Sequence, residues 1–126
     1  MSAAPAWSVT VALAVAAGGA AGSVLRYLVG VWVPRPHPGD FPVATLGINV
    51  AGSLLLAWLL RRFALEPAGP AVRAALTVGL CGGFTTFSAF SVEVVTLLQA
   101  GRPGRAVVYV LASVVAGVVA AWTALR

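Results

Sequence analysis

The sequence predicts an all-α integral membrane protein with four transmembrane helices, of which the third is broken in the middle of the bilayer. Hydrophobic residues make up 60% of the 126 residues and charged residues only 9%, against about 25% in ordinary soluble domains. Four apolar segments reach the length of roughly 20 residues that a membrane helix needs. One of them contains two adjacent glycines followed by threonines, which weakens a helix in mid-span. This composition excludes a soluble globular domain, a disordered tail and a nucleic-acid-binding protein.

The four predicted spans and the short joints between them form a single transmembrane domain over residues 1–126. The spans cover approximately residues 7–33, 41–60, 74–100 and 106–125. The joints contain prolines, which interrupt helices because proline lacks a backbone donor. The last joint, residues 101–105, is short enough to make the third and fourth spans antiparallel neighbours. A cleaved signal peptide is the alternative for the first span, but it has no basic region before it and continues to Val33.

Arginines are distributed almost evenly between the two sides of the predicted bundle. One side carries Arg61, Arg62, Arg73 and Arg126, and the other carries Arg35, Arg102 and Arg105. This distribution gives almost no positive-inside bias, so the chain could insert in either orientation. We hypothesise that two copies of opposite orientation associate as an antiparallel homodimer of dual topology.

The first span places one arginine in line with three glycines. Gly18, Gly22, Arg26 and Gly30 recur at every fourth position and therefore share one helix face. One explanation is a seam where small residues let another helix approach, with Arg26 extending to the membrane interface. The other is that Arg26 lies in a water-filled vestibule, where its fixed positive charge attracts anions.

Two further spans carry polar side chains at the same spacing. The second span has Thr45, Asn49 and Ser53, and the fourth has Tyr109, Ser113 and Gly117. Hydrogen bonds between helices are one explanation, because such bonds are common in membrane bundles. The alternative is that these faces converge on a polar path, since strongly polar groups in a bilayer usually face the protein interior or water.

The third span combines a weak helix with aromatic and polar residues. A break near Gly82 and Thr85 would free backbone carbonyls, which are tolerated in a membrane only when protein, ion or water satisfies them. Carbonyl oxygens are suitable ligands for a small hard cation. After the break, Phe87 and Phe90 lie on one face near Glu93. Because ring edges carry the positive part of the aromatic quadrupole, such a face could guide an anion.

Three segments of the chain resemble the signature segments of the Fluc (CrcB) family of fluoride channels. They are residues 18–27 in the first span, 45–52 in the second and 79–91 in the third. They occur in the family's order and spacing, and the third segment is the most specific. Ala44, Leu54 and Ala89 stand where the family often has glycine, phenylalanine and threonine, but none of them holds a central role.

The resemblance implies an antiparallel homodimer with two pores that exports cytoplasmic fluoride passively across the plasma membrane. By position, Asn49 would coordinate fluoride, and Phe87 and Phe90 would supply ring edges to it. The main-chain carbonyls of Gly82 and Thr85, two copies of each, would bind a structural sodium ion on the dimer axis.

The resemblance, together with the polar face of the second span for Thr45, suggests further residues for the ion pathway. They are Arg26, Thr45, Thr86, Ser88, Ser91, Glu93, Tyr109 and Ser113. Arg26 would lie at the vestibule, and Tyr109 and Ser113 would belong to a polar track. Spacing alone leaves open which of the others face the ion.

Two other functions have to be compared with a channel. A small four-span, proton-coupled drug antiporter is also a dual-topology dimer, but it needs a carboxylate in its first span, and this sequence has none there. Glu93, in the third span, is the only membrane carboxylate available for proton coupling. A non-transporting structural subunit would leave the broken third helix unexplained. An enzyme is not expected, because no nucleophile–base pair, nucleotide-binding loop or redox centre appears.

Overall fold

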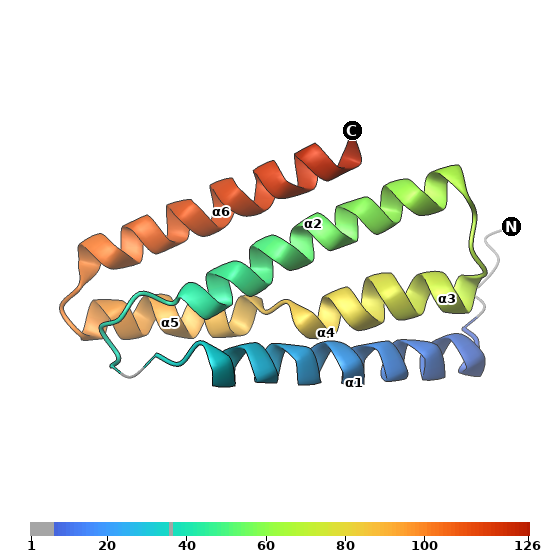
Figure 1. Cartoon of the computed structure of the whole chain (residues 1–126). Helices are drawn as coiled ribbons and strands as arrows, with labels where there is room; N and C mark the ends of the chain where they lie inside the picture. Colours follow the sequence, from blue (N-terminus) through green and yellow to red (C-terminus); the bar gives the residue numbers. More distant parts are fainter. Residues whose placement is uncertain (1–6, 36) are drawn as a thin grey trace, which may run out of the picture.

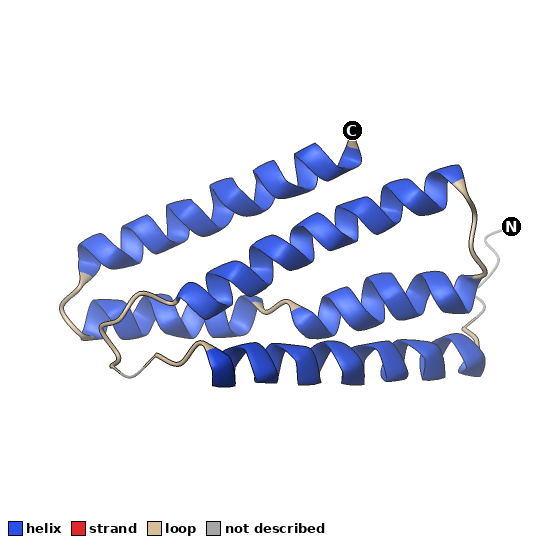
Figure 2. Cartoon of the chain, viewed as in Figure 1, coloured by secondary structure: helices blue, strands red, loops and turns tan. Residues whose placement is uncertain are grey.

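The computed structural model describes residues 7–35 and 37–126, which form a bundle of long helical segments (Figure 1). Four segments are long and apolar enough to cross a membrane: α1 (Val9–Trp32), α2 (Val43–Leu65), the interrupted segment Pro70–Gln99 and α6 (Pro103–Leu125). Within the described residues, all regular structure is helical (Figure 2). The prediction of an all-α chain with four membrane-length helices is confirmed.

The third segment is divided into four helical pieces with an extended break. It consists of α3 (Pro70–Ala74), the π-helix η1 (Ala75–Cys81), α4 (Gly82–Phe84) and α5 (Phe87–Gln99). Thr85 (φ −80°, ψ 158°) and Thr86 (φ −152°, ψ 115°) have extended backbones between α4 and α5. The two glycines predicted to weaken the helix are themselves helical. The break falls on the threonines because β-branched residues favour extended backbone and because the Thr86 hydroxyl caps α5 by accepting from the Ala89 N–H at 3.1 Å.

Helix α1 packs along the first half of the third segment through glycines (Figure 1). A Cβ atom at Gly18 would collide with the carbonyl oxygen of Ala75, and one at Gly22 would collide with the carbonyl oxygen of Leu80. These two positions therefore form the close-packing seam predicted for the first span. Gly30 does not belong to it, since nothing lies within 4 Å of its Cβ position.

Three helix boundaries differ from the predicted spans by three residues or more. Helix α2 continues to Leu65, past the predicted end at residue 60, because Arg62 pairs with Glu66 at 2.7 Å on its last turn. This hydrogen bond also lowers the pKa of the exposed Glu66 carboxyl. The third segment and α6 begin at Pro70 and Pro103, earlier than predicted. Proline is well tolerated in the first turn of a helix, where its missing N–H has no partner to lose.

We expect Gly22→Ala to destabilise the bundle, because the new methyl group must displace the backbone of η1 and α4. The expected loss is about 1–3 kcal/mol of unfolding free energy, typical of overpacking. Thermal or denaturant unfolding in detergent micelles measures it. The matched control is Gly30→Ala, which has open space around it and gains helix propensity. Equal stability of the two variants would contradict the proposed contact seam.

Candidate functional site

A carboxylate on α5 connects three helices on one side of the break. The Thr45 hydroxyl on α2 donates to Glu93 Oε1 at 2.8 Å, and the Tyr109 hydroxyl on α6 donates to Glu93 Oε2 at 2.7 Å. Thr45 and Tyr109 are buried. The guanidinium of Arg35, from the loop between α1 and α2, approaches Glu93 to 3.8 Å. Both carboxylate oxygens are therefore hydrogen-bonded, and a positive charge lies close to one of them.

The side-chain amide of Asn49 binds the backbone of the break directly. Its Oδ1 accepts from the N–H of Thr86 at 2.8 Å, and its Nδ2 donates to the carbonyl of Thr86 at 3.0 Å. This pair of bonds satisfies both backbone groups of one extended residue inside a membrane segment, where lipid could satisfy neither. One N–H of the amide remains for another acceptor, since an asparagine amide has two.

Arg26 binds the other side of the break. Its Nε donates to the carbonyl of Gly83 at 3.1 Å, and the side chain is half-buried. Gly83 lies in α4, at the carboxyl end of the first half of the broken segment, where helix carbonyls carry partial negative charge. Arg26 is therefore directed at the break within the bundle.

Four aromatic rings lie in a row from the break toward the loop between α1 and α2. Phe87 and Phe90 have centroids 5.6 Å apart, and Phe90 and Tyr109 have centroids 5.2 Å apart. Phe41 meets Tyr109 edge-on, with a centroid distance of 5.5 Å and an interplanar angle of 78°. Phe90 is half-buried, whereas Phe87 is 79% exposed on the surface of the single chain.

An open cleft of about 560 Å³ lies between α1, α2 and α5. We call it the polar cleft, and its polar and charged lining consists of Ser23, Arg26, Tyr27, Arg35, Thr45, Thr86 and Glu93. It therefore joins the Glu93 cluster to the arginine that binds the break.

A smaller pocket of about 190 Å³ includes Asn49, Gly82 and Thr85 in its lining. The Thr85 hydroxyl donates to the carbonyl of Cys81 at 2.9 Å. Among the described residues, no side-chain hydrogen bond goes to the carbonyl of Gly82 or Thr85. Gly82 is exposed on the surface of the single chain.

The remaining predicted residues are placed differently from one another. The Ser113 hydroxyl is buried and finds no hydrogen-bond partner within the described part of the chain. Ser88 is exposed, with its hydroxyl 3.2 Å from that of Thr86. The Ser91 hydroxyl donates to the carbonyl of Phe87 on its own helix at 2.9 Å. The structure thus gathers Thr45, Asn49, Thr86, Phe90, Glu93 and Tyr109, whereas Phe87 and Ser88 are exposed on the surface of the single chain. Ser91 is half-buried and bonds only to its own helix among the described residues.

Sequence reasoning counted Arg35 only as a loop charge and missed its place in the polar cleft. The available signal was that Arg35 follows α1 closely and lies between two prolines, which restrict the backbone of the loop and therefore the direction of its side chains. That signal does not identify the helix toward which the arginine extends.

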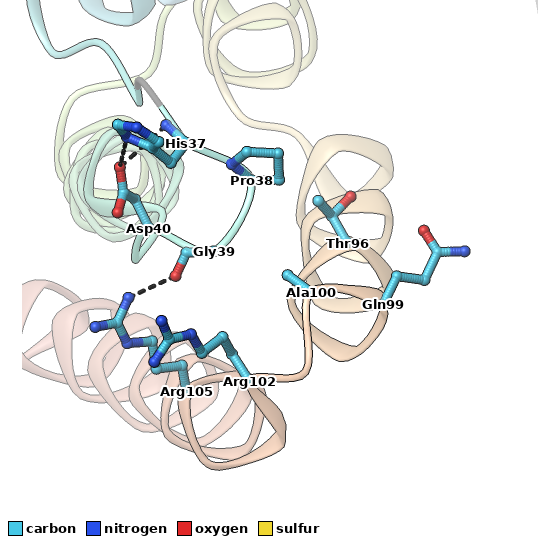
Figure 3. Close-up of a pocket in the computed structure, with 9 residues that line it drawn as sticks. All are labelled: His37, Pro38, Gly39, Asp40, Thr96, Gln99, Ala100, Arg102 and Arg105. Atoms are coloured by element: carbon cyan, nitrogen blue, oxygen red, sulfur yellow. Dashed lines mark hydrogen bonds and ion pairs between the residues drawn. The ribbon is translucent and has the colours of Figure 1, made fainter.

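A larger cleft of about 680 Å³ lies at the same end of the bundle and has a different lining (Figure 3). Its ionisable residues are His37, Asp40, Arg102 and Arg105, with His37 and Asp40 3.4 Å apart. Arg105 donates to the carbonyl of Gly39, which ties the loop to α6 (Figure 3). In the parts of the chain that the structure describes, no three or more histidine, cysteine or acidic side chains are grouped to hold a metal ion.

Four membrane-length helices around a hydrogen-bonded polar cluster define a multi-pass membrane protein with a polar site inside the membrane. The chain belongs to the CrcB family, because the family model described as "CrcB-like protein, Camphor Resistance (CrcB)" matches residues 13–125. This match confirms the family resemblance of the three sequence segments.

Similar proteins are named fluoride-specific ion channel FluC. The chain is 44% identical over 116 residues to such a protein from Azotobacter vinelandii, an alignment that covers 91% of this chain and 94% of the relative. It is 45% identical over 114 residues to one from Pseudomonas fluorescens, covering 90% and 92%. A third, from Agrobacterium fabrum, is 45% identical over 112 residues, covering 88% and 90%. A family of ion channels agrees with the expectation that the chain is not an enzyme.

We expect Asn49→Leu to destabilise the break, because it leaves the N–H and carbonyl of Thr86 without partners at nearly constant side-chain volume. The expected loss is about 1–3 kcal/mol for a buried unsatisfied group. Hydrogen exchange of the amides at residues 85–89 measures it locally. The control is Ser53→Ala, whose hydroxyl bonds only to the Asn49 carbonyl of its own helix at 2.7 Å. Unchanged exchange in Asn49→Leu would show that the two hydrogen bonds of Asn49 are not needed to hold the break.

Proposed function

We propose that the protein is a fluoride-selective channel of the plasma membrane that lets fluoride leave the cytoplasm passively. The observation that carries this proposal is the match over nearly the whole chain to relatives named fluoride-specific ion channels. The intramembrane polar site supports it independently, because strongly polar groups in membrane helices usually mark an ion or substrate path.

The side chains near the break suit a small, strongly hydrated anion. Such an ion must exchange its water for hydrogen-bond donors, and binding must remain weak enough for exit. The free N–H of Asn49 is a donor without a fixed charge that would trap the ion. The buried Ser113 hydroxyl on α6, which has no hydrogen-bond partner among the described residues, would be another. The edges of Phe87 and Phe90 would face the ion on its path, since ring edges are electropositive. The hydroxyls of Thr45, Thr86 and Tyr109 would lie along the same path, where those of Thr45 and Tyr109 would have to leave Glu93 to donate to the ion.

A second copy of the chain in the opposite orientation would complete the pores. Phe87 and Ser88 lie on the surface of the single chain, so another wall is needed to enclose an ion beside them. The nearly even distribution of arginines favours insertion in both orientations. We therefore propose an antiparallel homodimer of dual topology.

The same dimer would bring together two copies of the carbonyls of Gly82 and Thr85 around a structural sodium ion. The residues fit such a role, because no described side chain donates to these carbonyls and both residues border a small pocket. Carbonyl oxygens are the kind of ligand that hard cations prefer. When bound, sodium would link the two broken segments electrostatically, while Asn49 and Arg26 hold the backbone of each break in place.

A proton-coupled drug antiporter remains the second candidate, and the surroundings of Glu93 do not favour it. Both carboxylate oxygens accept hydroxyl hydrogen bonds, and Arg35 lies 3.8 Å away. With both oxygens bonded to side chains of neighbouring helices, Glu93 has a role in holding the bundle together that requires no proton coupling.

Fluoride selectivity is tested with the purified protein in liposomes. We expect rapid fluoride efflux with little chloride efflux, and a large loss of fluoride flux in Phe87→Ile, because an aliphatic chain has no electropositive edge. The matched control is Phe63→Ile, which makes the same change outside the aromatic row. Liposomes that release chloride as readily as fluoride would overturn the proposed function.

Dual topology is tested by labelling one cysteine at the end of the bundle. In a Cys81→Ser background, we expect Ala100→Cys, in the turn between α5 and α6, to react to about half with a membrane-impermeant maleimide in sealed vesicles, because this change leaves the nearly even charge distribution intact. Permeabilised vesicles should give full reaction. Ala68→Cys, in the loop at the opposite end, is the control and should also react to about half. Complete or absent labelling of Ala100→Cys in sealed vesicles would contradict dual topology.

A further inference from the structure

Arg35 reaches from the loop between α1 and α2 into the polar cleft that Arg26 also lines. Its side chain is 22% exposed, and its Nη1 lies 3.8 Å from Glu93 Oε1, beyond hydrogen-bond distance. Nη1 is buried and finds no hydrogen-bond partner within the described part of the chain. Nη2 makes only a long contact of 3.5 Å with the carbonyl of Pro38. The guanidinium therefore lies at the cleft with N–H donors that are available to another acceptor.

The carboxylate beside Arg35 is already bonded by other groups. Each Glu93 oxygen accepts a hydroxyl hydrogen bond, from Thr45 and from Tyr109. A close ion pair would normally take a guanidinium donor directly, often through two parallel bonds. A buried donor left unbonded costs free energy, so the Arg35 Nη1 group requires an acceptor, such as an anion or a water molecule, in the cleft.

Arg26 presents a second guanidinium to the same cleft. Its Nε is committed to the Gly83 carbonyl, but a guanidinium has four further N–H donors. With Arg26 and Arg35 positive and Glu93 negative, the charged lining of the cleft sums to 2 − 1 = +1. A concave site with low-dielectric walls concentrates such a field and raises the local concentration of anions.

We propose that Arg35, together with Arg26, forms an anion-binding site in the polar cleft, where fluoride is collected before it enters the pore. This inference rests on the proposed channel function and adds Arg35 as a residue that sets the rate of entry. Glu93 limits the affinity of the site for the anion, because its negative charge opposes the attraction of the two arginines. Thr45 and Thr86 line the same cleft.

Other arginines at this end of the bundle provide a comparison. Arg102 and Arg105 line the separate cleft of Figure 3 and do not line the polar cleft. Arg102 is exposed and carries the same charge as Arg35. An effect of overall surface charge would therefore be equal for Arg35 and Arg102, whereas an effect of the cleft would be confined to Arg35.

The test compares Arg35→Gln with the matched control Arg102→Gln in fluoride-efflux liposomes. We expect Arg35→Gln to lower flux at subsaturating fluoride roughly tenfold, because a hydrogen bond between a charged donor and an anion is lost. Flux at saturating fluoride should change little. The part of the loss that comes from long-range attraction of fluoride toward the cleft should shrink as inert salt is raised, since salt screens charges across solvent. Arg35→Lys should recover most of the flux, and Arg102→Gln should resemble the wild type.

A second variant tests the charge in a protein that has already folded. In the Cys81→Ser background, Arg35→Cys is reconstituted and then labelled with a cationic or an anionic thiosulfonate reagent. We expect the cationic reagent to restore flux at low fluoride and the anionic reagent to lower it further. Equal effects of the two reagents, or equal flux of Arg35→Gln and Arg102→Gln, would overturn this inference. A different result, a wild-type protein that shows no selectivity for fluoride, would overturn the proposed function itself.

Discussion

A break in the backbone of a membrane helix leaves N–H and carbonyl groups that lipid cannot satisfy, and the arrangement of this site follows from that constraint. Asn49 satisfies both groups of Thr86, and Arg26 satisfies the carbonyl of Gly83. These two side chains come from α2 and α1, so α1, α2 and the broken third segment must be in register before the break is stable. This requirement ties the position of the polar residues to the packing of the bundle.

The glycines of α1 and the hydrogen bond of Arg26 stabilise the contact between α1 and the third segment in different ways. Gly18 and Gly22 let α1 approach the backbone of η1 and α4, and this approach places Arg26 within reach of Gly83. A π-helix before the break adds a wider turn, a feature often found at functional sites. Small residues therefore set the distance between helices, and the hydrogen bonds then fix their alignment.

In the proposed channel, an anion would meet attraction at the polar cleft and uncharged donors farther in. Arg35 and Arg26 lie at the polar cleft, while Asn49 and Ser113 carry no charge. A full positive charge at the narrowest point would hold a small anion too strongly for rapid exit. Glu93, which accepts hydrogen bonds from Thr45 and Tyr109, reduces the net positive charge of the polar cleft.

The sequence by itself determined the four spans, the presence of a break in the third and the polar residues that gather around it. Composition and spacing suffice for these features, because a bilayer excludes charge and a helix repeats its faces at a constant period. The sequence marked the whole glycine–threonine segment as weak, and only the tertiary structure showed which residue of it is extended and held there, since the Asn49 amide that bonds Thr86 lies 37 residues away in the chain. The place of Arg35 was likewise undetermined, because the direction of a loop side chain depends on which helices pack beside it. Spacing along one helix contains no information on contacts between helices, and those contacts are what create the site.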